Sequence, residues 1–163
     1  MRRLVTGLLK GRIIRWSISA LIGAGLLLGT LLVQGGETVP YRSKTVGQIT
    51  YLDNGGVMLQ ETGIGTHLGN FTVAAETDEK GIVWLTITCA SKDELYGVVV
   101  AVSQDGTTVE LQIYDGTGRF KGASGSITAT FTYDPEPVSY SPLILGYTAI
   151  GTGTISTVGS TKK

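Results

Sequence analysis

The sequence predicts an all-β fold, because three observations agree. Of the 163 residues 24 are glycine, and threonine, valine, isoleucine and glycine dominate after residue 33, where strong helix formers are sparse. Short runs of β-type residues, about eight in all, recur at intervals of roughly 8–15 residues and are separated by turn residues. No helical pattern long enough for a parallel crossover lies between them, so neighbouring strands should pair antiparallel.

We therefore predict a closed eight-stranded antiparallel barrel, preceded by an N-terminal hydrophobic helix. An open sheet of this size would leave two edge strands exposed, whereas closure into a barrel removes both edges. A two-sheet β-sandwich is the alternative fold.

The first 36 residues are predicted to be a targeting segment. Five basic residues within the first fifteen precede the uncharged run Ser17–Val33, and small residues follow. This order is typical of a secretory signal peptide. The run is also just long enough for a membrane-anchor helix with Trp16 at the interface. Residues 1–36 are thus a signal peptide or an N-terminal anchor. Residues 37–163 form the β-barrel domain, which is exported and is either secreted, periplasmic or held outside the membrane.

The first expected strands follow from turn residues. "SKTVGQITY" leads to the turn Asp53–Gly56, and "VMLQ" and "THLGNFTVAAE" lie on either side of the glycines of "ETGIG". A turn at Asp78–Gly81 precedes "IVWLTITCA". "LYGVVVAVS" and "TTVELQIY" are joined by Gln104-Asp105-Gly106, a strong hairpin signal because Asp-Gly accepts positive φ at low cost. "SITATFTY", the proline-containing connection "DPEPVSYSP" and "LILGYTAIGTGTIST" complete the barrel.

Alternation is clearest in Ser126–Tyr133. One face carries Ile127, Ala129, Phe131 and Tyr133, and the other carries hydroxyl side chains. Val109, Leu111 and Ile113 likewise oppose Thr108, Glu110 and Gln112. This pattern predicts one packed face and one solvated face. The run Val98–Val100 breaks the alternation, which suggests cover on both faces, for example by another subunit.

The glycine-rich stretch "DGTGRFKGASG" (Asp115–Gly125) is predicted to be a corner of the sheet. A phosphate-binding glycine loop opens a helix, whereas the residues after Gly125 have period two. Glycines permit the backbone angles of a corner, and Asp115 can cap the turn through its side chain. Phe120 is expected to point inward as a plug.

The same stretch carries a resemblance. "DGTGRFKGASGSITATFTY" resembles the segment "GGTGxFxGAxG" plus strand of allene oxide cyclases, dirigent proteins and small exported bacterial proteins of that barrel type. "GTHLGNFT" and "ASKDELYGVVVA" are similar to pieces of the bacterial group, so the resemblance covers roughly residues 62–157. It implies an eight-stranded antiparallel barrel with an apolar lumen, often trimeric. Because enzymes and non-enzymes share the segment, it indicates fold rather than activity, and no catalytic residue is carried over.

Charge and composition exclude several functions. After residue 36 the chain has eight basic and thirteen acidic residues, a net charge of −5, so nucleic acid is not an expected partner. One histidine and one cysteine do not supply a transition-metal ligand set, and we expect neither metal nor cofactor. Cys89 lies in a strand-like run and is expected to be a buried thiol rather than a reactive one. The acids lie mostly in turns, so the two inward carboxylates of a glycosidase are not expected.

Four residues are candidates for a ligand site. His67 shares its strand phase with Phe71, so it could enter the lumen near one mouth and polarise a ligand or transfer a proton, or be structural. Arg119 could bind an anionic ligand, or pair with Asp115 or with nearby carbonyls. Tyr133 and Tyr147, like Tyr96 and Tyr114, have hydroxyls that could line a cavity, or they simply pack.

Three functions remain, one of them that of a structural partner protein that uses its outer face. The first, which we favour, is a non-enzymatic exported barrel that binds a small apolar molecule in its lumen or serves as an oligomeric envelope or secreted component. The second is a cyclase or isomerase that acts on a hydrophobic substrate in the lumen, with His67 as the catalytic candidate. Shape and a few polar groups can suffice for such catalysis, so missing motifs do not exclude it.

Overall fold

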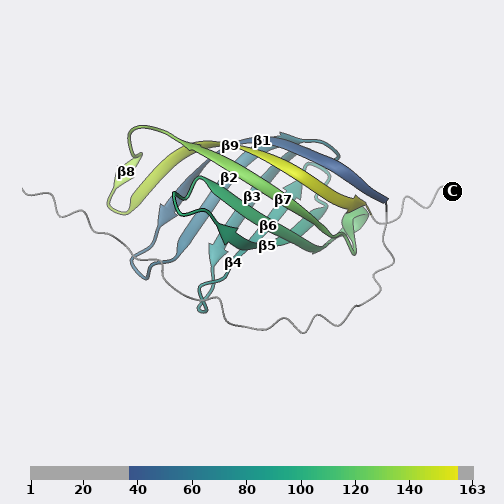
Figure 1. Ribbon diagram of the computed structural model, residues 1–163, viewed down its shortest axis with the longest axis horizontal. Helices are drawn as coiled ribbons and strands as arrows, with labels where there is room; N and C mark the ends of the chain where they lie inside the picture. Colours follow the sequence, from purple (N-terminus) through teal and green to yellow (C-terminus); the bar gives the residue numbers. More distant parts are fainter. Residues whose placement is uncertain (1–36, 158–163) are drawn as a thin grey trace, which may run out of the picture. The chain divides into compact units, whose positions relative to one another are not determined.

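The computed structural model describes residues 37–157, and the predicted signal peptide or anchor lies outside this range. A single antiparallel sheet has the order β1-β2-β3-β4-β5-β6-β7-β9-β8, and β1 pairs again with β9 (Figure 1). The strands are β1 (Glu37–Tyr51), β2 (Val57–Gly65), β3 (Gly69–Thr77), β4 (Val83–Cys89), β5 (Glu94–Val102), β6 (Thr108–Gly116), β7 (Gly125–Tyr133), β8 (Ser139–Tyr140) and β9 (Leu143–Thr157).

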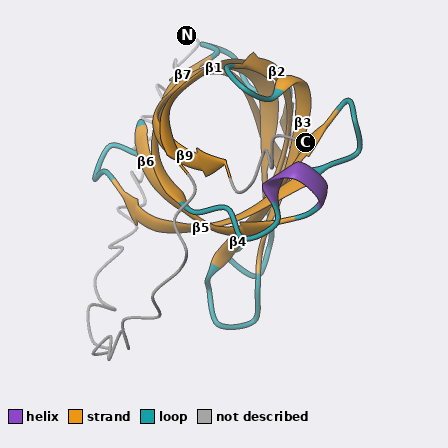
Figure 2. Ribbon diagram, turned by 90° about the vertical axis from the view of Figure 1, so that its right-hand side faces the viewer, coloured by secondary structure: helices purple, strands orange, loops and turns teal. Residues whose placement is uncertain are grey.

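The closed eight-stranded antiparallel barrel is confirmed, and the sandwich alternative is excluded. β1 and β9 pair from Glu37↔Thr157 to Thr50↔Ile144, which closes the ring seen in Figure 2. The two-residue β8 pairs only with the first residues of β9 and stands outside the eight-strand circuit. Alternation holds as predicted in β7, where Ile127 is buried and Ser126 and Thr128 are exposed.

One predicted boundary is wrong. The glycines of "ETGIG" belong to β2 rather than to a gap between strands, and the turn is formed by Thr66, His67 and Leu68. The reason is steric: a Cβ at Gly63 would lie 2.6 Å from the carbonyl oxygen of Lys44 and 3.1 Å from the ring of Phe71. Glycine there permits close packing inside the barrel rather than a turn.

A bulge accounts for the broken alternation at Val98–Val100, and cover by another subunit stays a prediction. Val99 pairs with Leu111 and Ala101 with Glu110, so Val100 has no partner in β6. Its side chain is 59% exposed. A bulge inserts an extra residue and locally resets the alternation.

The predicted sheet corner is confirmed. The carboxylate Oδ1 of Asp115 accepts hydrogen bonds from the N–H groups of Gly116 and Gly122, each at 2.8 Å. A short 3₁₀ helix, η1 (Gly118–Phe120), lies in the corner, and β7 rather than an α-helix follows. Phe120 is buried, as expected of a plug.

The two ends of the barrel differ. The closed end, on the right in Figure 1, carries the β2–β3 and β4–β5 turns and the β6–β7 corner. Its inward side chains are almost fully buried: Leu68, Leu95, Ile113, Phe120, Ala123 and Ile155. At the opposite, open end the inward side chains are only partly buried, among them Leu59, Val83, Leu111, Phe131 and Tyr133. The inward side chains are therefore packed more tightly at one end of the barrel than at the other.

Candidate functional site

A carboxyl group faces the lumen of this otherwise apolar barrel. Glu61 is on the inward face of β2, in phase with the partly buried Leu59. Its Oε2 accepts a hydrogen bond from the hydroxyl of Thr45 at 2.9 Å and another from the hydroxyl of Tyr147 at 3.0 Å. Thr45 and Tyr147 are both buried.

The strand register explains how these groups meet. Gly47 of β1 pairs with Glu61 on one side and with Tyr147 on the other. A Cβ at Gly47 would lie 2.5 Å from the Cβ of Glu61. Because no side chain stands between them, the phenol of Tyr147 reaches across β1 to the carboxylate.

Burial shifts the proton affinities of this pair. Burial raises the pKa of Glu61, and the hydrogen bonds from Thr45 and Tyr147 oppose the shift. Burial, followed by the charge of Glu61, raises the pKa of Tyr147. Tyr147 therefore stays a hydrogen-bond donor, while Glu61 can exchange a proton nearer neutral pH than an ordinary carboxyl does.

An aromatic wall adjoins the carboxyl. The rings of Phe131 and Tyr147 are 4.9 Å apart, and the ring of Tyr133 lies 6.1 Å from Phe131 and 6.2 Å from Tyr147. The hydroxyl of Tyr133 donates to the carbonyl of Gly106 at 3.0 Å in the β5–β6 turn. We call Glu61, Thr45, Tyr147, Phe131 and Tyr133 the Glu61 cluster. It can accept or donate one hydrogen bond deep in the lumen and offers ring surface to an apolar molecule.

Two of the four candidate residues belong to this cluster, and two do not. Tyr133 and Tyr147 lie together in it. His67 is exposed in the β2–β3 turn with φ 65°, so the expectation that its strand phase carries it into the lumen is wrong. The strand ends at Gly65, and the turn takes His67 out of phase. A role of His67 in binding stays a prediction.

Arg119 is held at the outside of the closed end. Its Nε lies 3.5 Å from Oδ2 of Asp93, and its Nη2 donates to the carbonyl of Leu68 at 3.4 Å. The expected carbonyl contact is thus confirmed, but the carboxylate partner is Asp93 rather than Asp115. Asp115 is instead occupied by the corner backbone.

Sequence reasoning missed Glu61, Thr45 and Gly47. The strand was expected to stop before "ETGIG", and the acids were expected mostly in turns. The signal was the period of two, which continues unbroken from Val57 to Gly65 and puts Glu61 in phase with Leu59.

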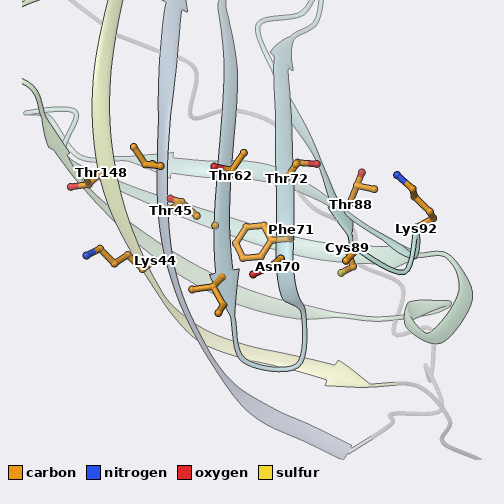
Figure 3. A pocket seen from close by; sticks show the side chains of 14 residues that line it. Lys44, Thr45, Thr62, Asn70, Phe71, Thr72, Thr88, Cys89, Lys92 and Thr148 are labelled. Atoms are coloured by element: carbon orange, nitrogen blue, oxygen red, sulfur yellow. The ribbon is translucent and has the colours of Figure 1, made fainter.

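A separate groove lies on the outer surface. It has a volume of about 670 Å³ and crosses β9, β1, β2, β3 and β4. Figure 3 shows Thr148, Thr62, Thr72 and Thr88 in a row across these strands, with Lys44 toward one side and Lys92 at the other. Val46, 58% exposed, lies between Thr148 and Thr62, and Ile64, 61% exposed, lies between Lys44 and Asn70. We call this the outer groove. Thr45 is the one member of the Glu61 cluster that also lines the outer groove.

Neither a metal centre nor a spanning helix is found in the described part of the chain. Within residues 37–157, no group of three or more His, Cys, Asp or Glu side chains is placed to hold a metal ion. No helix in the same range is long and apolar enough to cross a membrane.

Comparisons with known proteins give a likeness to solved structures. No family model and no curated protein matches the sequence. Among solved structures, the chain is similar to the pterocarpan synthase dirigent protein GePTS1, with a TM-score of 0.45 and 12% sequence identity. The alignment covers 82% of this chain and 98% of that chain. The closed barrel itself is established by the strand pairing described above.

Proposed function

We propose that the barrel binds a small, mainly apolar molecule in the open half of its lumen, with Glu61 as the polar anchor. The observation that carries this proposal is a largely buried carboxyl inside an apolar barrel. Placing a carboxyl there costs stability compared with an apolar side chain of similar size. Such a residue is therefore better explained by a ligand than by packing.

The hydrogen bonds of Glu61 leave capacity for a ligand. Thr45 and Tyr147 both donate to Oε2, and Oε1 accepts no hydrogen bond from any residue between 37 and 157. An ionised Glu61 would accept a hydrogen bond from a ligand hydroxyl or amine, and a protonated one would donate to a carbonyl. The rings of Phe131 and Tyr133 favour a ligand with a flat apolar body.

Native mass spectrometry of the exported domain with extracted cell metabolites tests this proposal. We expect a retained small molecule, and we expect Glu61→Gln to lose most of it. Glu76→Gln is the matched control, since Glu76 is exposed on the outer face of β3. A ligand-free wild-type protein, or equal retention by both variants, would contradict the proposal.

An enzymatic function is the second candidate, favoured by the contact of Glu61 with Tyr147. A carboxyl of raised pKa beside a phenol, shielded from bulk water, is suited to transfer a proton during isomerisation or cyclisation. The test is conversion of the retained molecule into an isomer of equal mass by the wild type and not by Glu61→Gln. His67→Ala, exposed outside the lumen, should convert it at the wild-type rate.

Self-association is supported by the outer groove. Val46, Ile64 and Ile150 are 58%, 61% and 59% exposed on neighbouring strands, and burial against further copies would cover them. We expect an oligomer, a trimer if the resemblance extends to assembly. Ile64→Lys should dissociate it, whereas Val138→Lys, in the connection after β7, should not. A monomeric wild-type protein would contradict this.

We also infer that the domain is exported. Support comes from the basic start and the uncharged run Ser17–Val33. Cell fractionation of the full chain tests this, since export places the domain outside the cytoplasmic membrane. Mass measurement of the recovered protein distinguishes a cleaved signal peptide from a retained anchor.

A further inference from the structure

Three aromatic side chains gather on the outer face of the barrel, on β4, β5 and β6. The rings of Trp84 and Tyr114 are 5.9 Å apart with planes at 85°, and the ring of Tyr96 lies 6.4 Å from Tyr114. Trp84 is 41% exposed and Tyr114 is 50% exposed. We call these three residues the outer aromatic cluster. Large rings left exposed together are uncommon on a soluble surface and indicate a binding site.

A β-bulge builds this cluster. Tyr96 pairs with Asp115 and Gly97 pairs with Ile113, so Tyr114 has no partner across the ladder. As a result Tyr114 and Asp115 are both exposed, although they are consecutive residues of a strand. Bulges commonly redirect a side chain beside a functional site.

Carboxylates hold two of the rings in place. Oδ2 of Asp78 accepts a hydrogen bond from the indole N–H of Trp84 at 2.9 Å. Oε2 of Glu94 accepts one from the hydroxyl of Tyr96 at 2.7 Å. Asp115 adds a third negative charge beside Tyr114. The hydrogen bond with Glu94 is the main cause that raises the pKa of Tyr96, and the charge of Asp115 adds a smaller contribution. Two of the three rings are therefore held by hydrogen bonds, and negative charge lies beside the cluster.

Basic side chains do not neutralise this charge. Between residues 37 and 157, the one ion pair within 4.0 Å is that of Arg119 with Asp93, so Asp78, Glu94 and Asp115 have none. The hydrogen bond from Trp84 contributes most to lowering the pKa of Asp78, and the charge of Lys80 contributes least. Because Asp78 and Asp115 already accept hydrogen bonds from the backbone, these carboxylates would attract a cation from solution mainly through their negative charge.

We infer that the outer aromatic cluster binds an organic ammonium ion, such as a trimethylammonium or another alkylated amine group. The exposed ring faces attract a cation through their π-electrons, and the neighbouring carboxylates add to that attraction. A neutral sugar would gain from the rings but not from the charges, and an anion would be repelled. The site lies on the outside of the sheet, so it does not depend on ligand binding in the lumen.

Calorimetric titration of the full chain with choline tests this inference. We expect saturable binding that weakens as sodium chloride is added, because exposed charges are screened by salt. The neutral isostere 3,3-dimethylbutan-1-ol should bind at least about five-fold more weakly, since it lacks the positive charge. The disaccharide cellobiose serves as the neutral-sugar comparison.

The chain offers matched controls. Tyr114→Leu and Glu94→Gln should each weaken choline binding by about five-fold or more. Tyr140→Leu and Glu136→Gln alter a second exposed tyrosine–glutamate pair, joined by a 3.3 Å hydrogen bond in the connection after β7, and should leave binding unchanged. Circular dichroism confirms that each variant is folded. The Asp78→Asn variant should also weaken choline binding, because it removes the charge and one of two acceptor oxygens: Oδ1 of Asp78 accepts from the N–H groups of Lys80 and Ile82, and Oδ2 accepts from Trp84.

Three outcomes would overturn the inference: no choline binding at millimolar concentration, equal binding of the neutral isostere, or stronger binding of cellobiose than of choline. Phosphatidylcholine vesicles distinguish the source of the ammonium group. Binding of both vesicles and free choline would indicate a lipid headgroup, and binding of free choline alone would indicate a soluble amine.

Discussion

Gly47 has no side chain, and this allows the hydrogen bond between Tyr147 and Glu61. It lies between them in the register of β1 with β2 and β9. A methyl group at this position would meet the carbonyl oxygen of Gln60 and the Cβ of Glu61, each at 2.5 Å. The spacing leaves no room for relaxation without moving β2 or the carboxyl.

Gly47→Ala should therefore destabilise the protein by about 1–3 kcal/mol through overpacking. It should also displace Glu61 and reduce ligand retention. Urea denaturation measures the first effect and native mass spectrometry the second. Thr62→Ala, on the exposed outer face of β2, is the control and should change neither. A Gly47→Ala protein of wild-type stability would show that the contact is looser than these distances imply.

The raised pKa of Glu61 predicts a pH dependence of stability. When folding raises the pKa of a carboxyl, the folded state binds more protons than the unfolded state between the two pKa values. Stability from this group is then complete below the unfolded pKa of 4.5 and is lost as pH rises through the folded value.

Urea denaturation of the wild type and of Glu61→Gln, between about pH 4 and pH 8, measures how the free energy of unfolding changes with pH. The wild type should lose stability relative to the variant as pH rises, because glutamine can still accept both hydrogen bonds and never ionises. A difference that stays constant over this range would mean that Glu61 titrates normally.

At the scale of elements, the turns and the corner were the most predictable parts. Backbone angles and side-chain caps form these features, and both depend on nearby residues alone. This holds for the turns at Asp105-Gly106 and Asp78–Gly81 and for the corner at Asp115. Gly63 and Gly65 were misread because glycine serves both turns and close packing. The neighbouring strands determine which of the two roles a glycine has. At Gly63 it is close packing, because Phe71 of β3 fills the space.

The same reasoning explains which site residues could be predicted. The inward direction of Tyr133 in β7 and of Tyr147 in β9 was predictable, because it depends only on alternation within each strand. The contact of Glu61 with Tyr147 depends on the registers of β1 with two strands, distant in sequence, and no local pattern reveals it. The predicted inward direction of His67 was wrong because β2 ends at Gly65 and the turn begins at the next residue.

Asp115 should be important for the corner. Its carboxylate accepts two backbone N–H groups, and these hydrogen bonds, first that from Gly122, lower its pKa. Asp115→Ala should lower the thermal midpoint more than Asp53→Ala, which removes a turn aspartate with no side-chain hydrogen bond to residues 37–157. The difference should shrink as pH falls below the ordinary pKa of 3.8, where the carboxylate of the wild type becomes protonated. Equal midpoints for the two variants would mean that the glycines alone form the corner.

At the scale of the whole molecule, the barrel combines a packed end with an open one. Leu95, Ile113 and Ile155 are fully buried at the closed end, whereas Leu59 and Leu111 are only partly buried toward the open end. Because closure removes the sheet edges, the ring of strands can persist even if one end of the barrel is less stable than the other. The open half is therefore where we propose that a ligand binds, while the closed half maintains the fold.

This division predicts a gradient in amide hydrogen exchange. Amides with many buried contacts open only with global unfolding, whereas those in weakly packed regions open locally. Amides around Ile113 and Ile155 should exchange most slowly, and those near Leu59 and Tyr133 faster. Addition of the retained lumen ligand should slow the second group and leave the first unchanged, because binding fills only the open half. Uniform exchange along the barrel, or ligand protection confined to the closed end, would contradict the division and with it the location of the ligand beside Glu61.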